Sequence, residues 1–367
     1  MPYTTIVTEG GLLPADILDQ IAAGEIEGQR PEDFGLPRTR RVLDEIAAAW
    51  GDARAHWDSF QHSLRRLPPA DPATSITRER WVRPLLEALG YSDLTYTPRA
   101  AVLNGRTYSI SHRAGQDETA PPVHIEGLRT SLDKRAESGR PRLSPHALLQ
   151  EYLNDDEDHL WGLVTNGERL RLLRDSAQMT RPRYVEFDLQ GMLTGERFTD
   201  FVLLYRLLHR SRLPRPGEDG AQARLERYFQ MAVEAGGRVR ERLRDGVEAA
   251  LLALGNGLLS HPASAPLRRR LASGELTPMA LYQQLLRLVY RLLFLMVAEE
   301  RDLIAVEDDV ADPLSPQAYR LPRDERLAVY REHYSVARLR RLAEARGVGR
   351  GPYDDLWLGL VQTFCMF

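Results

Sequence analysis

Two Asn-Gly pairs, each set between short stretches of strand-forming residues, constrain this chain's fold more than any other sequence feature. Asn104-Gly105 and Asn166-Gly167 are typical of tight β-hairpin turns, because both residue types tolerate positive φ angles. The second pair joins 161–165 to 169–174, and its composition predicts a type I′ turn. Further strands are expected at 100–103, 107–110, 123–126 and 184–188, with a helix over 145–153. Residues from about 95 to 190 are therefore expected to form a sheet.

Apolar residues at helical spacing flank this segment on both sides. Residues 1 to about 70 are expected to be helical, and Thr77 is expected to cap a helix that ends at Gly90. After about residue 195 the pattern is helical to the end. It includes a long amphipathic helix that the pair Gly236-Gly237 should weaken.

The strongest helix signal lies near residue 280. Thr277 followed by Pro278 predicts a helix start, and the segment 279–300 is apolar on nearly every face, which favours the middle of a helical bundle. Four polar residues argue against lipid: Gln283, Gln284, Arg287 and Arg291. The longest apolar run, 292–298, is far shorter than the ~20 residues of a membrane span, so no membrane association is expected.

These patterns predict an α+β chain that is predominantly helical. We expect an N-terminal helical region at 1–70, a mixed α/β domain with two hairpins at 71–215, and a C-terminal helical bundle at 216–367. Three prolines within 68–72 mark the first boundary. Because 353–367 ends on an apolar run without a polar tail, we also expect the chain to be the N-terminal part of a longer protein.

Composition excludes several classes of protein. The net charge of -3 shows that any nucleic-acid surface must arise from local clustering of cations. Lys134 is the only lysine, and no Gly-Lys pair exists, which excludes a phosphate-binding P-loop. The single cysteine, Cys365, excludes a disulfide framework and fits a reducing cytoplasm.

The strand-rich segment has the element order of a restriction-type nuclease core: an entry helix, a hairpin, a strand, a helix and further strands. Such cores bind metal through a carboxylate on one strand and a Glu-x-Lys on the next. Here Glu126 occupies the acidic position, but Leu128 occupies the lysine position. We interpret this as a vestigial nuclease site without a metal. The alternative, an ordinary α/β domain with Glu126 on its surface, stays open.

Several blocks resemble one family in particular, the type IIG-like adenine-specific DNA methyltransferases, including the methylases of the DISARM and BREX phage-defence systems. The similar blocks, which follow the family's order between about 71 and 367, are 75–91, 149–154, 160–167, 282–295 and 298–301. The resemblance implies a nuclease-like domain and a helical connector that precedes a methylase domain.

The chain departs from that family in its catalytic motifs. None of its four asparagines precedes Pro-Pro, as the family's Asn-Pro-Pro-Tyr/Phe motif requires. Gly255-Asn256-Gly257 and Gly347-Val348-Gly349 follow helical patterns, so we interpret both as helix ends rather than as a turn for S-adenosylmethionine. The resemblance thus implies S-adenosylmethionine for the intact protein, bound beyond Phe367. No catalytic residue and no cofactor are expected in this chain.

Arginine clusters are the candidates for binding double-stranded DNA. Arg238 and Arg242 belong to a run with arginine at every second position, and Arg268, Arg269 and Arg270 are consecutive. Duplex DNA attracts such side chains through counterion release. Glutamates interleave with the first cluster, which is also typical of a solvated helix face. Other subunits of a defence complex are further expected partners.

Histidines offer no metal site by their spacing. His112, His124, His146, His159 and His209 are scattered, and satisfied or exposed histidines explain them. The leading hypothesis is the N-terminal scaffold or DNA-binding portion of an adenine-specific DNA methyltransferase. Two alternatives stay open: a non-catalytic DNA-binding or assembly subunit that is complete as given, and a metal-dependent nuclease with unusual ligands around Glu126.

Overall fold

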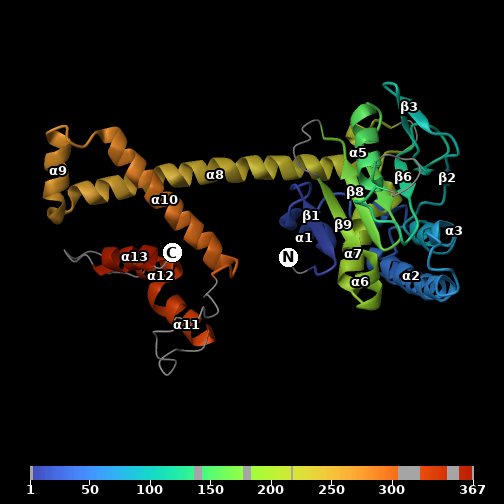
Figure 1. Cartoon of the computed structure of the whole chain (residues 1–367), viewed down its shortest axis with the longest axis horizontal. Coiled ribbons are helices and arrows are strands. Elements are labelled where there is room, and N and C mark those ends of the chain that lie inside the picture. Colours follow the sequence, from blue (N-terminus) through green and yellow to red (C-terminus); the bar gives the residue numbers. More distant parts are fainter. Residues whose placement is uncertain are drawn as a thin grey trace. The chain divides into compact units, whose positions relative to one another are not determined.

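The computed structural model describes residues 3–135, 143–176, 183–215, 218–304, 323–344 and 355–365 (Figure 1). These residues form an α+β protein in which helices prevail, as predicted. The chain divides into two compact units, Met1–Gly237 and Arg238–Phe367, and the division falls within the long helix α8 (Arg224–Ser260). The boundaries expected after residues 70 and 215 do not coincide with it.

The N-terminal unit contains a sheet and the helices that cover it. Its strands are β1 (Ile6–Glu9), β2 (Leu94–Tyr96), β3 (Ala101–Leu103), β4 (Arg106–Tyr108), β5 (His112–Ala114), β6 (Pro122–Ile125), β7 (Trp161–Thr165), β8 (Arg169–Arg174) and β9 (Tyr184–Asp188). Its helices are α1 (Ala15–Ala23), η1 (Pro31–Phe34), α2 (Val42–Leu64), α3 (Thr74–Thr77), η2 (Arg78–Val82), α4 (Arg83–Ala88), α5 (Pro145–Asp155), α6 (Leu189–Thr194), α7 (Phe198–Leu208), η3 (Arg210–Arg212), η4 (Gly220–Gln222) and the start of α8.

The main sheet has seven strands in the order β1-β9-β8-β7-β6-β5-β2, and β3 pairs separately with β4. Neighbouring strands are antiparallel except for β6 and β7, which are parallel and in the register Val123↔Leu163. Parallel neighbours need a crossover connection, and here α5 provides it. The carboxyl ends of β6 and β7 therefore meet at one edge of the sheet.

Strand β1 corrects the expectation that residues 1–70 are helical throughout. It pairs with β9 in the register Ile6↔Phe187, so the first residues of the chain complete the far edge of the sheet. The backbone N–H and hydroxyl of Thr5 also donate to Asp200, at 3.0 and 2.6 Å. Strand β1 has only four residues and one buried apolar position. Its local signal is therefore weaker than the helical pattern that follows it.

Apolar side chains cover both faces of the sheet. One face packs against α1, α2, α4 and α7, around large buried side chains such as Trp81, Trp161 and Phe187. The opposite face packs against α5 and the β3–β4 hairpin, around Tyr108 and Tyr152. A sheet buried on both faces explains why β7 reads as a nearly continuous apolar run.

The helix that Thr77 was expected to cap begins four residues earlier, at Thr74. Ala73, in the left-handed region at φ 64°, precedes α3, and its N–H donates to Asp71 Oδ1 at 2.7 Å. Thr77 is instead fully buried within the helix, and its hydroxyl accepts the backbone N–H of Leu128 at 3.1 Å. A tertiary hydrogen bond therefore explains this threonine, not a cap. Gly90 ends the segment in the left-handed region, as predicted.

Both predicted hairpins are present, but their turns differ. Asn104 and Gly105 both have positive φ, as a two-residue type I′ turn requires. In the second hairpin only Gly167 has positive φ, so the predicted type I′ turn is wrong there. The Asn166 side chain accepts the N–H groups of Glu168 and Arg169, at 3.1 and 2.8 Å, and closes a longer loop.

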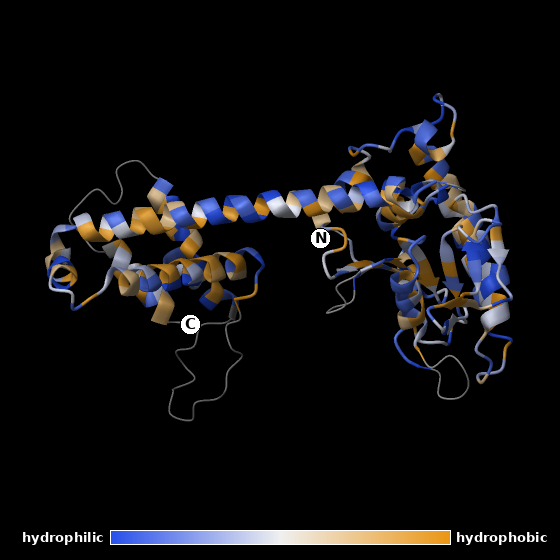
Figure 2. Ribbon diagram, turned by 90° about the horizontal axis from the view of Figure 1, so that it is seen from above, coloured by the Kyte–Doolittle hydropathy of each residue, from blue (hydrophilic) through white to orange (hydrophobic). Residues whose placement is uncertain are grey.

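The second unit is helical throughout the residues described. Besides most of α8 it contains η5 (Pro262–Ser264), α9 (Ala265–Ala272), α10 (Pro278–Glu300), α11 (Arg323–Val329), η7 (Tyr330–Tyr334), α12 (Val336–Glu344) and α13 (Asp355–Cys365). Hydrophilic and hydrophobic residues alternate along α8, as the amphipathic pattern predicted (Figure 2).

The glycines of α8 do not interrupt it. The helix continues through Gly236-Gly237, where a weak point was expected, and through Gly255-Asn256-Gly257, which is therefore not a helix end. Helical backbone at the second site also excludes the strand-to-helix turn that S-adenosylmethionine sites use, so this site does not fit that cofactor. Gly347-Val348-Gly349 lies outside the described residues.

Helix α10 begins as predicted, because the Thr277 hydroxyl accepts the Ala280 N–H at 3.1 Å. The expectation that it lies in the middle of a bundle is wrong, since its neighbours cover only part of its circumference. Its buried residues are Leu285, Val289, Leu295 and Ala298. Its exposed large apolar residues are Met279, Tyr282, Tyr290, Phe294, Met296 and Val297. Within the part of the chain that is described, α10 is the one helix long and apolar enough, by length and composition alone, to cross a membrane.

Candidate functional site

The predicted vestigial nuclease position lies at the carboxyl end of β6. Glu126 follows the strand directly, and its Oε1 lies 3.1 Å from Nε2 of His124, which is buried on the same face. The backbone N–H of Ser111 donates to Nδ1 of His124 at 3.3 Å. Since Nδ1 accepts, Nε2 carries the proton and donates to the carboxylate. A hydrogen bond to His124 therefore holds the glutamate that was predicted from the sequence.

Ser111 lies beside this pair without forming a nucleophilic site. Its Oγ accepts the N–H of Ile125 at 2.8 Å and lies 2.8 Å from Nδ1 of His112. No contact joins that oxygen to the ring of His124, so a Ser-His-Glu relay is not assembled. Burial, with Arg78, His124 and Arg83 nearby, lowers the pKa of His112 to about 4.

The position where a metal-dependent nuclease would carry its lysine, near Glu126, holds a leucine. Leu128 packs its side chain against the apolar core, and Lys134 is exposed in the following loop. Across the described ranges, no three His, Cys, Asp or Glu side chains gather closely enough to hold a metal ion. This edge therefore offers one carboxylate without the partners that position Mg²⁺ and activate water.

A polar pocket of about 500 Å³ lies at the same edge of the sheet, and the sequence did not reveal it. Arg171 is one of the residues that line it. The guanidinium donates to both carboxylate oxygens of Asp133, at 2.6 and 2.8 Å, and to Glu186 at 2.5 Å. It also lies 4.6 Å from the centre of the Tyr184 ring. Arg169 donates to the other oxygen of Glu186 at 2.9 Å.

Electrostatics in this pocket favour the charged forms of the paired groups. The hydrogen bonds from Arg171 outweigh burial and lower the pKa of Asp133. Burial together with Arg171 lowers the pKa of His146, at the start of α5, to about 4. The third arginine that lines the pocket, Arg129, donates to the carbonyls of Pro68 and Asp71. All three arginines therefore already have acceptors. The contact between Arg171 on β8 and Asp133 ties the 127–133 loop to the sheet.

The charge pattern that could have indicated this network is visible in the strands. Arg169 and Arg171 lie on one face of β8, opposite Asp188 and Glu186 of β9. Opposite charges at alternate positions of paired strands are typical of cross-strand ion pairs. Asp133 lies in a loop and has no such periodicity.

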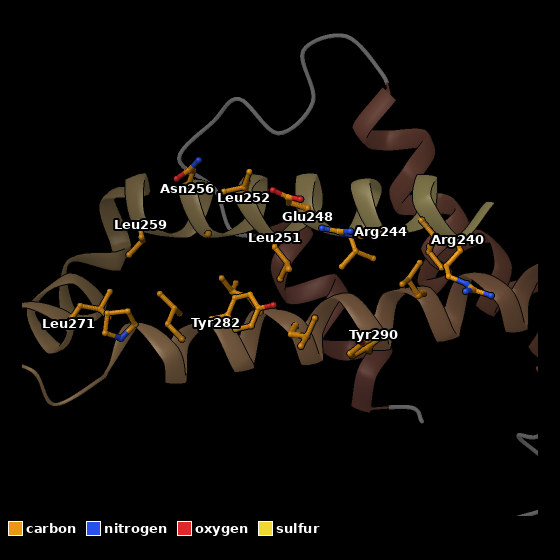
Figure 3. Close-up of a pocket in the computed structure, with 18 residues that line it drawn as sticks. Arg240, Arg244, Glu248, Leu251, Leu252, Asn256, Leu259, Leu271, Tyr282 and Tyr290 are labelled. Atoms are coloured by element: carbon orange, nitrogen blue, oxygen red, sulfur yellow. The ribbon is translucent and has the colours of Figure 1, made fainter. Parts of the chain in front are cut away.

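In the second unit, an apolar groove of about 1060 Å³ lies between α8 and α10 (Figure 3). Figure 3 shows Leu259 and Leu271 toward one end, and Arg240 and Tyr290 toward the other. The remaining lining residues are Leu243, Arg244, Val247, Glu248, Leu251, Leu252, Gly255, Asn256, Pro278, Leu281, Tyr282, Leu285, Leu286 and Leu293. The lining is thus mainly leucine, with its charged side chains on α8.

The five arginines predicted to contact DNA are all exposed, but their hydrogen-bonding partners differ. Arg268 donates to the carbonyls of Leu259 and His261, at 2.8 and 2.9 Å, and so closes the end of α8. Arg270 pairs with Glu275 at 2.7 Å. Arg242 and Arg269 have no hydrogen-bonding partner among the residues described.

The structure does not bring the two arginine clusters into one patch. Arg238 and Arg242 lie on α8, whereas Arg268, Arg269 and Arg270 lie on α9, beyond the end of α8. Arg242 precedes Leu259, the contact of Arg268, by 17 residues of helix, which is about 25 Å at 1.5 Å per residue.

No protein-family model, curated protein or solved structure matches this chain. Its function is therefore inferred from its own residues and geometry.

Proposed function

We propose that this chain is the N-terminal, non-catalytic portion of an adenine-specific DNA methyltransferase of a restriction–modification or phage-defence system. In this proposal its sheet is a restriction-nuclease-like core that does not cut, and its role is to hold and orient double-stranded DNA. Methyl transfer from S-adenosylmethionine would take place in a methylase domain outside these residues.

The main support for the proposal is the order in which the chain forms the helices and strands of the sheet. Helix α4 leads into the antiparallel strands β2, β5 and β6, and α5 then crosses over to β7, parallel to β6. This is the order of elements expected for a restriction-type nuclease core. Glu126 lies at the end of β6, where such a core carries its acidic residue, but it is bonded to His124. The path supports a nuclease-like origin, and the side chains support a non-cutting role.

The arginines supply the expected DNA contacts. Phosphate contacts need exposed guanidinium groups without competing carboxylates, because the counterions released on binding provide much of the affinity. Arg242 and Arg269 meet this requirement, whereas Arg270 would have to exchange Glu275 for a phosphate. The α9 cluster is therefore expected to contribute through Arg269 first.

DNA binding can be tested by fluorescence anisotropy with a labelled duplex over a series of salt concentrations. We expect the combined Arg268→Ala, Arg269→Ala and Arg270→Ala variant to bind more weakly. The slope of log affinity against log salt should fall by about 0.9 for each phosphate that the variant no longer neutralises. The matched control replaces Arg38, Arg40 and Arg41, which are exposed in the N-terminal unit. Unchanged affinity and slope in the α9 variant would remove this cluster from the proposal.

Catalysis is tested separately. Plasmid incubated with the purified chain and Mg²⁺ or Mn²⁺ should stay intact. Cutting that disappears in the Glu126→Ala variant would replace the proposal with a metal-dependent nuclease. The natural gene offers an independent test, because the proposal expects Asn-Pro-Pro-Tyr or Asn-Pro-Pro-Phe to be encoded after Phe367.

A further inference from the structure

The groove between α8 and α10 leaves several large apolar side chains exposed to water. Leu243 is 53% exposed, Leu252 60%, Tyr282 47% and Tyr290 60%. All four side chains line the groove, and Figure 3 labels Leu252, Tyr282 and Tyr290 among them. A groove lined by exposed apolar side chains is a candidate site for binding a partner.

We propose that this groove binds an amphipathic helix from another protein, with acidic residues beside its apolar face. Both walls are helical, and their lining residues recur at helical spacing, as in Leu243, Val247 and Leu251 on α8. A third helix laid along such a groove can insert residues at i, i+4, i+7 and i+11. From Leu243 to Leu259 the α8 wall is about 24 Å long, which corresponds to a bound helix of four to five turns.

The shape and the lining favour a helix over a small ligand. At about 1060 Å³ the groove lies at the upper limit of the ~300–1,000 Å³ range of small-molecule pockets. Small-molecule sites also place polar groups around the ligand to orient it. Here the charged lining residues, Arg240, Arg244 and Glu248, all belong to one wall.

The charged residues that line the groove indicate the charge of the partner helix. Arg240 and Arg244 line the groove and have no ion-pair partner among the described residues, and the third charge, Glu248, leaves an excess of one positive charge. A helix with glutamate or aspartate beside its apolar face would pair with these arginines. A second copy of this chain that docked through its own groove would bring the same excess of positive charge, and like charges oppose such a pairing.

The probe is a synthetic amphipathic peptide of about 18 residues, with leucines at i, i+4, i+7 and i+11 and glutamates on both sides of them. A matched peptide carries lysine in place of every glutamate. Fluorescence anisotropy with the full chain, without DNA, measures the binding of each. We expect the glutamate peptide to bind at least about tenfold more tightly.

Three variants locate the site. Leu252→Glu should abolish binding, whereas Leu358→Glu should not change it, since Leu358 is similarly exposed on α13 and lies outside the groove. Exchanging both arginines, as Arg240→Glu with Arg244→Glu, should reverse the preference toward the lysine peptide. A reversal also shows that this variant is folded.

Other outcomes would overturn the inference. Equal binding of the two peptides, or binding that Leu252→Glu leaves unchanged, would mean that the groove does not select an acidic helix. A dimer in analytical ultracentrifugation that Leu252→Glu dissociates would assign the groove to a second copy of the chain. The inference does not depend on DNA binding, because no DNA is present in these measurements.

Discussion

Three histidines with lowered pKa values, two of them buried and one half-buried, should make the N-terminal unit lose stability between pH 7.5 and 5.5. The pKa values of His112, His146 and His209 are each lowered to about 4, first by burial and then by neighbouring arginines. His209 is 9% exposed and packs against the rings of Phe34 and Tyr205, with each ring centre 5.2 Å away. Its Nδ1 accepts the N–H of Ser211, so its second nitrogen carries the proton of the neutral form.

The sign follows from where the proton binds. A histidine with an ordinary pKa near 6.5 in the unfolded chain and about 4 in the folded protein takes up its proton preferentially in the unfolded state. Its stabilisation is present above pH 6.5 and is lost as the pH falls from 6.5 toward 4. At pH 5.5 each such histidine lowers the free energy of unfolding by about 1.4 kcal/mol, and three lower it by about 4 kcal/mol.

Carboxylates with lowered pKa values do not obscure this range. The pKa values of Asp133 and Glu226 are lowered from 3.8 and 4.5, so their stabilisation is present above those values and is lost only at more acidic pH. Urea unfolding followed by tryptophan fluorescence reports mainly on the N-terminal unit. That unit contains Trp50, Trp57, Trp81 and Trp161.

His209→Asn tests the reasoning, because asparagine can accept the same Ser211 N–H but does not titrate. From pH 7.5 to 5.5 the wild-type protein should lose about 4 kcal/mol and the variant about 2.7 kcal/mol. The control is His56→Asn, an exposed position on α2, which should leave the pH dependence of the wild type. Equal pH dependence of His209→Asn and the wild type would refute the assignment of His209 as a neutral, buried group.

Two further predictions concern the N-terminal unit. Glu226→Gln should lower the free energy of unfolding in urea by about 3 kcal/mol. Arg174 donates two 2.9 Å hydrogen bonds to Glu226 and would lose its buried counter-charge. A loss below about 0.5 kcal/mol would contradict this. Gly28→Ala should destabilise by at least about 1 kcal/mol, since Gly28 has φ +86° and a Cβ there would lie 2.6 Å from Nε of Arg224. Its control, Gly51→Ala within α2, should stabilise by about 0.5–1 kcal/mol in the same assay, because no atom lies within 4 Å of the added carbon.

Local signals in the sequence were enough for much of the sheet and for several helix ends. The Asn-Gly pair at 104–105 predicts a two-residue turn because both residues adopt positive φ, and the structure confirms it. Thr277 and Pro278 similarly predict the start of α10 from groups only three residues apart. Such signals depend on hydrogen bonds and backbone preferences within one turn.

The candidate sites were predictable only in part. The position of Glu126 at the end of a strand could be predicted, but its bond to His124 depends on both side chains leaving the same face of β6 at the sheet edge. The Arg171 network needs Asp133, 38 residues away, from a loop without periodicity. The groove was not predicted, because the apolar pattern of α10 was interpreted as that of a buried helix. An apolar helix is expected to be covered by its neighbours, and the sequence does not show that α10 is covered on only part of its surface.

By itself the sequence determined the α+β fold class, most of the strands and the positions of the exposed arginines. These features follow from composition and from interactions between near neighbours. Only the tertiary structure decided that β1 pairs with β9, that Thr77 bonds to Leu128, and that α8 and α10 leave an apolar groove between them. The physical reason is separation along the chain. Pairing Ile6 with Phe187 depends on the free energy of the whole fold, since many other partners satisfy the same local preferences.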